Sequence, residues 1–238
     1  MKTFKHSGDM GDIIYSLPAI RAVGGGVLYL DVDGGKDEPI ITEQLRPIKQ
    51  DRLRFGEEQF GFLFPLLTAQ DYIKDVRVWN GEKVDIDLNQ WRKLIEQHQC
   101  LNITEAHLRW VGKNEVKQYE PWLKGTLADE PYIVVSRSHR FHTNDLFWLS
   151  NRLHIEERGI FVGTELEHEV FCVLLGVEVQ FKRVENAQEI AKLIAGGHEM
   201  WGNQSLPMAI AVGLGVKLFQ ERAPITNCIF PMRDSQYV

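Results

Sequence analysis

The sequence predicts an α/β protein with two Rossmann-like lobes, each built on a doubly wound parallel β-sheet. Residues 2–32 open the chain with a strand, a helix and a second strand, which together form a βαβ unit. From Tyr132 onward, short apolar strands alternate with helical segments, as in a second parallel sheet. Residues 121–131 between these halves are predicted to be a linker. We therefore expect an N-terminal lobe at 1–127 and a C-terminal lobe at 128–238.

The elements of the N-terminal half follow from the spacing of its apolar residues. Strands are expected over 2–6, 27–32, 72–79 and 83–88, and helices over 13–23 and 90–97. Between 34 and 70 the pattern weakens, and a basic cluster followed by four phenylalanines occupies 46–64. The simpler interpretation of this stretch is a solvated face followed by a core segment. The alternative is a surface that contacts an anionic acceptor or a membrane. This makes 46–64 the candidate for peripheral membrane contact.

The C-terminal half has a regular alternation of strands and helices. Strands are expected over 132–136, 159–162, 177–181 and 216–220, with another ending near Trp201, and helices over 145–153, 165–175, 187–195 and 206–214. In such sheets, ligands bind at the carboxyl ends of the strands. The tail from Ala223 could return to the first lobe.

Composition and charge narrow the class of protein. With 44% hydrophobic and 25% charged residues, the 238-residue chain is typical of a soluble globular protein. Its net charge of −6 argues against bulk binding of nucleic acid. The three cysteines are dispersed and odd in number, which predicts neither a disulfide framework nor a zinc site and favours the cytoplasm. No signal peptide or membrane span of about 20 apolar residues is evident.

The stretch WGNQSLPMAIAVGLG, residues 201–215, predicts a phosphate-binding turn. Gly202, Asn203, Gln204 and Ser205 form a tight connection between a strand and the helix 206–214. Either Ser205 or Asn203 is suited to cap that helix. Backbone N–H groups and the positive end of the helix dipole then point out of the sheet edge, a geometry that binds phosphate.

Two further strand ends carry polar residues to the same edge. Ser136, Arg137 and Arg140 follow the strand 132–136, in a segment that also holds two histidines. Arginines keep their charge and suit a diphosphate, whereas the histidines lack a third metal ligand in the sequence. Glu165 and Glu167 follow the next strand. A carboxylate there could accept both ribose hydroxyls, although complementing the helix dipole is the commoner role.

Two competing motifs are weaker. Gly8 and Gly11 do not form the glycine pattern of a dinucleotide site, and Asp9 and Asp12 in the same turn would repel a pyrophosphate. Two D-x-D motifs, residues 31–33 and 85–87, could suggest a divalent metal, but both acids of each lie on one face of a strand. We therefore predict no metal site.

Three segments resemble one family, the heptosyltransferase-like glycosyltransferases of the ADP-heptose:lipopolysaccharide type. MGDIIYSLPAI at 10–20 is similar to the family's opening motif, and VENAQEIA at 184–191 to the segment before its donor turn. WGNQSLPM at 201–208 resembles the donor turn itself. The resemblance implies a compact glycosyltransferase-B-like fold, with an acceptor-side N-terminal lobe and a nucleotide-sugar-binding C-terminal lobe.

The resemblance also implies roles for particular residues. Asp12 matches the acid that deprotonates the acceptor hydroxyl, and Gly11 and Tyr15 lie in the same acceptor-side motif. Arg140 falls where the family places a cation on the donor phosphates, and Glu167 where it places the ribose-binding acid, with Glu165 as a competitor.

The implied enzyme is a hexosyl- or heptosyltransferase. It would move a sugar, with inversion and without metal, from a nucleoside-diphosphate sugar to a glycan or glycolipid hydroxyl. The donor is a substrate, so no cofactor is expected, and nucleic acid is not an expected partner.

The donor turn departs from the family pattern. Gln204 replaces the usual aspartate, and Leu206 and Ala209 replace the usual glycine and histidine. If the turn binds through its backbone N–H groups, these changes cost little. Two alternatives therefore stay open: a catalytically silent nucleotide or nucleotide-sugar binding protein, and a sugar-nucleotide epimerase of the same architecture.

Overall fold

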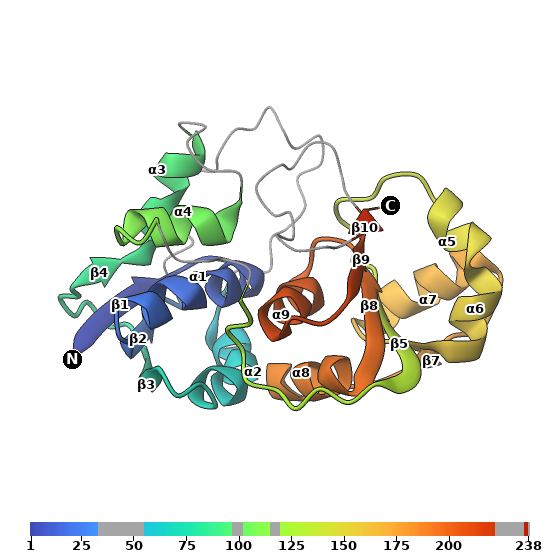
Figure 1. The fold of residues 1–238 in the computed structure, drawn as a ribbon, viewed down its shortest axis with the longest axis horizontal. Helices are drawn as coiled ribbons and strands as arrows, with labels where there is room; N and C mark the ends of the chain where they lie inside the picture. The colour runs from blue at the N-terminus through green and yellow to red at the C-terminus, as the bar shows by residue number, and fades with distance from the viewer. Residues whose placement is uncertain (33–54, 97–101, 115–119, 222–235, 238) are drawn as a thin grey trace. The chain divides into compact units, whose positions relative to one another are not determined.

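The chain forms two compact units, Met1–Val116 and Lys117–Val238, in a computed structural model that describes residues 1–32, 55–96, 102–114, 120–221 and 236–237. Each unit contains one parallel β-sheet with helices on its faces (Figure 1), so the predicted fold class is confirmed. The described linker belongs with the second unit, because the Trp122 and Leu123 N–H groups donate to the Gly213 carbonyl. The predicted domain limit at residue 127 stays a prediction.

The first unit has the strand order β3-β2-β1-β4. Its elements are β1 (Lys2–His6), α1 (Met10–Ala22), β2 (Gly26–Leu30), α2 (Glu57–Thr68), β3 (Ile73–Val78), β4 (Ile86–Asp87), the 3-10 helix η3 (Leu88–Gln90), α3 (Trp91–Glu96) and α4 (Ile103–Trp110). The chain passes from β1 to β2 and β3 on one side, and then adds β4 on the other side of β1. The edge between β1 and β4 is therefore the topological switch point, where ligands bind in open α/β sheets.

Helix α1 begins earlier than the sequence predicts. It starts at Met10 instead of Ile13, with Asp9 at the N-cap position. The apolar spacing is visible only from Ile13 onward, because buried positions begin there. The consequence is functional, since Gly11 and Asp12 become part of the first helical turn and not of a loop.

Helix α2 occupies a stretch for which the sequence predicts no element. Leu63, Leu66 and Leu67 are buried, while Phe64 is 38% exposed. Pro65 lies within the helix and cannot donate to the residue four positions earlier, which is the exposed Gly61. Because Gly61 is exposed, the missing bond costs less than it would in the core.

The candidate membrane-contact segment, 46–64, lies partly outside the described residues, since the structure describes only 55–64 of it. Membrane contact there stays a prediction. Among the described residues, no helix has the length and apolar character that a membrane span requires.

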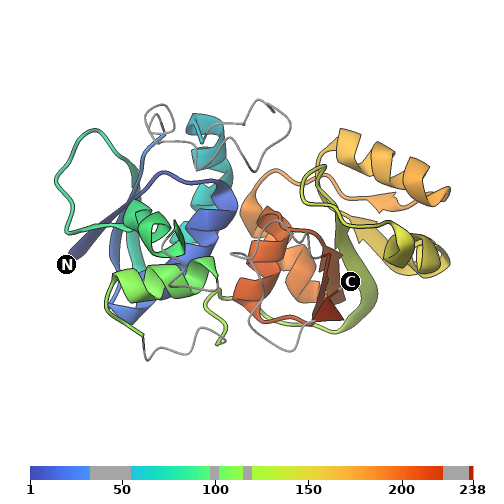
Figure 2. The same cartoon turned by 90° about the horizontal axis from the view of Figure 1, so that it is seen from above.

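The second unit has the strand order β10-β9-β8-β5-β6-β7. Its elements are β5 (Glu130–Ser136), α5 (Leu146–Ser150), α6 (Arg152–Arg158), β6 (Gly159–Phe161), α7 (Glu165–Leu175), β7 (Gln180–Phe181), α8 (Ala187–Gly196), β8 (Gly197–Gly202), α9 (Leu206–Leu214), β9 (Leu218–Gln220) and β10 (Gln236–Tyr237). Helices α8 and α9 cover one face of the sheet, and α5, α6 and α7 cover the other (Figure 2). Here the switch point lies between β5 and β8.

Capping residues set the limits of the best-predicted helices. Helices α7 and α9 have the predicted bounds. Thr164 and Glu167 form a reciprocal capping box at the start of α7, while Gly176 and Gly215 end α7 and α9 in the left-handed conformation. Residues 222–235, which include the tail from Ala223, lie outside the described residues, and β10 pairs with β9 of the second unit.

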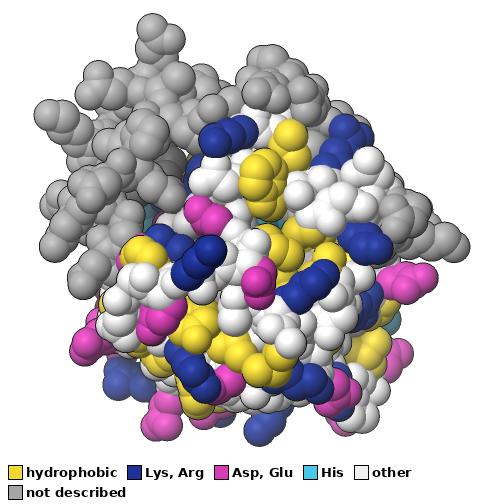
Figure 3. Space-filling view, turned by 90° about the vertical axis from the view of Figure 1, so that its left-hand side faces the viewer, with side chains coloured by type: hydrophobic (Ala, Val, Ile, Leu, Met, Phe, Trp, Pro, Cys, Tyr) yellow, Lys and Arg dark blue, Asp and Glu magenta, His cyan; other side chains and the backbone are white. Residues whose placement is uncertain are grey.

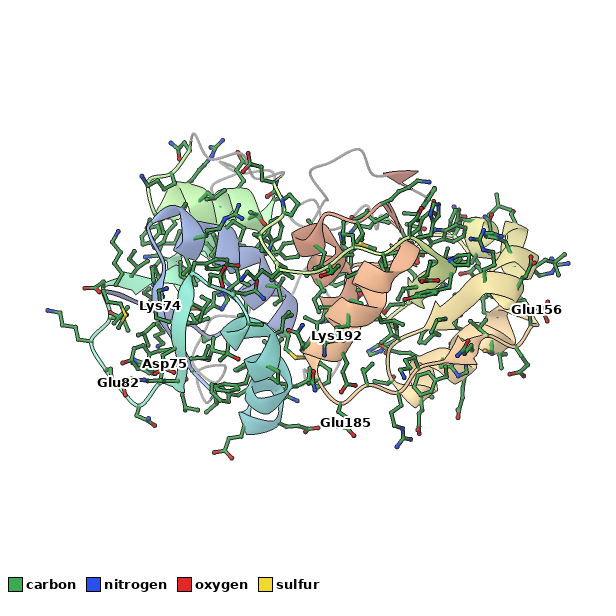
Figure 4. All side chains as sticks on the ribbon, turned by 60° about the horizontal axis from the view of Figure 1, so that its bottom comes forward. Lys74, Asp75, Glu82, Glu156, Glu185 and Lys192 are labelled. Carbon is green, nitrogen blue, oxygen red and sulfur yellow. The ribbon has the colours of Figure 1, made fainter. Side chains whose placement is uncertain are left out.

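Charges of both signs are mixed on the surface. On the face drawn in Figure 3, basic side chains are interspersed with acidic and hydrophobic ones. Exposed residues marked in Figure 4, such as Lys74 on β3, Glu156 on α6 and Lys192 on α8, repeat this mixture. A uniformly basic surface would favour nucleic acid, and the described surface shown in these views is not of that kind.

Candidate functional site

In each unit, predicted site residues lie at the topological switch point of the sheet. In the first unit, β1 leads into the turn that precedes Asp12, and β4 lies beside it. In the second, Ser136 ends β5 and Gly202 ends β8, and these two residues are paired in the sheet. The sequence therefore carries its candidate residues to the two positions where α/β sheets bind ligands.

The Asp12 carboxylate lies in the first turn of α1, beside a cation from another element. An oxygen of Asp12 is 3.5 Å from a guanidinium nitrogen of Arg92, and both side chains are about one-fifth exposed, at 22% and 21%. Gly8 lies beneath them: a Cβ there would be 3.1 Å from the Asp12 Cβ and 3.0 Å from Arg92 Nη2. A carboxylate at this position has both the favourable end of the helix dipole and a cation to hold it in place.

Two histidines that the sequence analysis assigned no role are buried below this turn. His6 ends β1 and His107 lies in α4, with their Nε2 atoms 3.2 Å apart. The Gly8 N–H donates to Nδ1 of His6 at 2.9 Å, and Nδ1 of His107 is 2.9 Å from the Ile103 carbonyl oxygen. The two residues are 101 positions apart, so no local pattern could have paired them.

Burial keeps both histidines neutral. Loss of hydration lowers the pKa of His107 to about 3, with Arg92 adding to the effect and the Ile103 hydrogen bond opposing it. Burial also lowers the pKa of His6 well below its usual value, and His107 and Arg92 add to the shift. Of the charged groups nearby, Arg92 therefore acts on both rings.

These shifts predict acid sensitivity of the first unit. In the unfolded chain a histidine takes up a proton near pH 6.5, whereas these two native histidines do not. Their contribution to the free energy of unfolding is therefore complete above pH 6.5 and is lost progressively below it. The free energy of unfolding should fall by about 1.4 kcal/mol per pH unit for each histidine. Urea unfolding at pH 7.5, 6.5 and 5.5 measures the slope. His107→Gln should make the slope shallower, whereas substitution of the exposed His142 should not; equal slopes would contradict the assignment.

In the second unit, the end of β8 is bound to the loop after β5. Asn203 is fully buried; its side-chain oxygen accepts from the Ser138 N–H at 3.0 Å, and its amide group donates to the carbonyls of Ser138 and Arg140. A Cβ at Gly202 would lie 2.4 Å from the Ser136 carbonyl oxygen, so only glycine permits this approach. The predicted turn therefore positions the neighbouring loop.

Arg137 has carboxylate partners within its own unit, and its predicted contact with the donor phosphates stays a prediction. Its guanidinium donates to both oxygens of Glu221, at 2.8 and 2.9 Å, and to Asp145 at 2.7 Å. Its side chain is 5% exposed and that of Glu221 is 1% exposed. The structure thus places Arg137 inside an ion-pair network, because the carboxylate that neutralises it comes from the end of β9, 84 residues away.

Glu221 is the acceptor at the centre of this network. Besides Arg137, the Thr143 N–H donates to it at 2.7 Å and the Trp148 indole N–H at 3.1 Å. Burial alone would raise the pKa of Glu221, but the hydrogen bonds from Arg137, Thr143 and Trp148 outweigh it and lower the pKa. Glu221 therefore stays ionised and fixes the loop 137–145 by accepting hydrogen bonds from Arg137 and Thr143.

Arg140 is the half-buried cation of that loop. Its guanidinium lies over the Phe141 ring, 5.4 Å from the ring centroid, and its carbonyl accepts from Asn203. Phe141 has a φ of +60°, a left-handed conformation that is uncommon for an aromatic residue. Such strained residues are concentrated at functional sites, which supports the role predicted for Arg140.

The two glutamates of α7 have separate partners. Glu165 pairs with Arg183, and Glu167 accepts from the Thr164 N–H in the capping box. An oxygen of Glu167 is also 3.6 Å from Nδ1 of His139, in the loop that carries Arg140. Glu167 therefore caps the start of α7, where its charge also complements the helix dipole, and it reaches the loop 137–145.

The remaining predicted residues surround the start of α9. Ser205 occupies the N-cap position, where its hydroxyl donates to the Asn203 carbonyl at 3.2 Å, and Gln204 is buried. The N–H groups that open a helix have no partner within it, and those of α9 point toward this edge. In the first unit, Gly11 is in the first turn of α1 and Tyr15 is buried, and the acceptor-side roles of both stay predictions.

The D-x-D motifs have structural partners. Asp85 accepts from the N–H and the hydroxyl of Thr3, and Asp87 accepts from the Asn89 N–H. Asp31 pairs with Lys5 at 2.9 Å, and Asp33 lies outside the described residues. In the described part of the chain, no three histidine, cysteine or acidic side chains gather as a metal site would require.

Two parallel-sheet α/β units in succession are the architecture of the glycosyltransferase-B-like fold. Solved structures of glycosyltransferases superpose on nearly the whole chain. The family 9 glycosyltransferase from Veillonella parvula gives a TM-score of 0.61 over 99% of this chain and 84% of its own, at 9% identity. The E. coli heptosyltransferase WaaC with ADP gives 0.58 over 99% and 89%, at 11% identity.

A second WaaC structure, with ADP-2-deoxy-2-fluoro heptose, gives a TM-score of 0.59 over 99% of this chain and 91% of its own, at 10% identity. No family model and no curated protein matches the sequence. The resemblance predicted from three short motifs is therefore confirmed for the fold.

Proposed function

We propose that the chain is an inverting, metal-independent hexosyl- or heptosyltransferase of the cytoplasm. It takes a nucleoside-diphosphate sugar as donor and a glycan or glycolipid hydroxyl as acceptor. One observation carries the proposal: the switch point of the first unit holds a carboxylate, Asp12, and that of the second holds a cation, Arg140, beside the start of α9. The structures of WaaC with ADP and with an ADP-sugar support this class of donor.

The proposed donor site lies in the second unit, and its residues suit a diphosphate. Arg140 supplies a charge that does not titrate, and the first N–H groups of α9 supply donors at the positive end of its dipole. Asn203 holds the loop of Arg140 against the end of β8, so the two parts keep a fixed spacing. Glu167, which contacts the same loop through His139, is the candidate for the ribose hydroxyls.

Asp12 supplies the base. In the proposed reaction its carboxylate takes the proton of the acceptor hydroxyl as that oxygen attacks the anomeric carbon of the donor sugar. The bond from this carbon to the diphosphate breaks, and its electron pair leaves with the nucleoside diphosphate. Attack from the face opposite the leaving group inverts the anomeric configuration. Arg140 and α9 stabilise the charge that develops on the departing diphosphate.

The function is tested with the purified chain and a panel of nucleotides. Calorimetry with ADP, GDP and UDP identifies the base, and donor turnover is followed as release of nucleoside diphosphate with water as the acceptor. Proton NMR of the released sugar should show inversion, and EDTA should leave the rate unchanged. Binding without release would favour the silent binding protein, and a changed sugar on an intact donor would favour the epimerase.

Arg140→Ala is expected to weaken nucleoside-diphosphate binding by about 10- to 150-fold, because a charged hydrogen bond contributes about 1.5–3 kcal/mol. Calorimetry measures the change. Arg152→Ala, which removes an exposed arginine from α6, is the matched control and should bind as the wild type does. Unchanged affinity in Arg140→Ala would remove this residue from the donor site.

A further inference from the structure

The buried histidines have hydrogen-bond partners that fix where their protons lie. The Gly8 N–H has a proton to donate and no lone pair to offer, so Nδ1 of His6 must be the acceptor. A neutral His6 then carries its proton on Nε2, which faces Nε2 of His107 at 3.2 Å. The Nε2 of His107 must accept it, which leaves the His107 proton on Nδ1, directed at the Ile103 carbonyl at 2.9 Å.

This arrangement forms a one-way series of hydrogen bonds from the turn before α1 to the backbone of α4. Both rings are fully buried, so breaking any bond would leave a polar atom without water. The start of the series is Gly8, one residue before the N-cap of α1. The series therefore connects the position of that turn to α4, a helix that packs against α1.

The turn and the Asp12 side chain have little room to move separately. A Cβ at Gly8 would be 2.7 Å from Cε1 of His6, 3.0 Å from Nη2 of Arg92 and 3.1 Å from the Cβ of Asp12. The three side chains therefore converge on one glycine. The Ile13 N–H donates to the Asp9 carbonyl at 3.2 Å, so the first turn of α1 follows the turn 7–9.

We infer that His6 and His107 are positioning residues for the Asp12 carboxylate, fixing the turn before α1 through a neutral, directed pair of imidazoles. The inference rests on the proposed function of Asp12 as the base. The histidines do not touch substrate. They fix the turn in the position in which the Arg92 guanidinium contacts the Asp12 carboxylate. A misplacement of about 1 Å in such a group costs on the order of 10²-fold in rate, which gives the pair its effect on catalysis.

The first test needs no variant. Long-range ¹H–¹⁵N NMR of the histidine rings at pH 6 should show His6 protonated on Nε2 and His107 protonated on Nδ1. The Nδ1–H form of His107 is required both by the Ile103 carbonyl, which can only accept, and by the Nε2–H of His6. The opposite tautomers, or a charged ring in either residue, would overturn the inference.

The second test compares three variants in donor turnover. In His107→Leu the ring of His6 loses its acceptor, and kcat should fall about ten- to hundredfold with donor KM changed less than about twofold. In His107→Gln the amide oxygen can accept from His6, and kcat should recover to within about threefold of the wild type. Leu108→Ala removes a buried neighbour in α4 and serves as the packing control, with a lower melting temperature but wild-type kcat.

The outcomes separate this inference from the proposed function. If the wild type releases no nucleoside diphosphate from any donor, the proposed function fails, and the ring spectra alone decide the histidine assignment. If the wild type is active and His107→Leu keeps its kcat, the positioning role is wrong although the function stands. If His107→Leu does not fold, the absence of rescue in His107→Gln would overturn the role.

Discussion

Asp12→Asn is expected to lower the rate of sugar transfer by about 10²–10⁴-fold while leaving donor affinity unchanged. An amide cannot accept the acceptor proton, yet asparagine has nearly the shape of aspartate and fits the same position in the first turn of α1. Donor turnover and calorimetry on the same preparation measure the two quantities. Because Arg92 loses its charged partner, a small decrease in melting temperature should accompany the loss of rate.

Asp9→Asn is the control for this change. Asp9 lies three residues away in the same turn, at the N-cap of α1. Its substitution removes one acidic charge from the same helix end, so any effect that comes only from the local field should appear in both variants. A wild-type rate in Asp12→Asn, or equal losses in the two variants, would end the assignment of Asp12 as the base.

Glu221→Ala is expected to destabilise the second unit by about 3–5 kcal/mol, because removing one partner leaves a buried charge uncompensated. Among the described residues, the carboxylate that Arg137 would keep is that of Asp145, whose side chain is 45% exposed. The Thr143 N–H and the Trp148 indole N–H would lose their acceptor as well. Nucleotide affinity should fall with stability, since Glu221 holds the loop that carries Arg140.

Thermal unfolding with and without ADP measures both effects of Glu221→Ala. Asp145→Ala is the matched control, because it removes the other carboxylate on Arg137 from a half-exposed position. Because the Asp145 carboxylate is half exposed and water can replace it, its loss should cost less than the loss of Glu221, nearer to the value of about 1 kcal/mol for a solvated ion pair. Equal destabilisation in the two variants would show that burial of the Arg137–Glu221 pair is not what stabilises the loop.

Local sequence signals predicted much of the fold. The bounds of α7 and α9 were predicted correctly because Thr164, Gly176 and Gly215 mark helix ends through interactions within a few residues. Helix α2 was missed because the cost of Pro65 depends on whether Gly61 reaches water, which the sequence does not reveal. The start of α1 was predicted too late, at Ile13 instead of Met10, because the apolar spacing does not extend into its first turn.

The candidate site was predictable only where each residue acts within its own segment. Asp12, Arg140 and the turn at Gly202 could be located from the chain alone, since a strand end and a helix start define them. The ion pair of Arg137 could not be located in this way, because its partner Glu221 is 84 residues away. The pairing of His6 with His107 left no signal, since a buried histidine at a strand end looks like any other core residue.

The left-handed backbone at Phe141 has a thermodynamic consequence for ligand binding. Asn203 and Glu221 hold the loop on both sides of this residue, so its unfavourable conformation is imposed when the unit folds and not when a ligand arrives. A nucleotide that meets such a preformed loop loses little conformational entropy on the protein side. Its association should be fast and nearly free of a slow rearrangement step, and its heat-capacity change should reflect only the surface that the nucleotide itself covers.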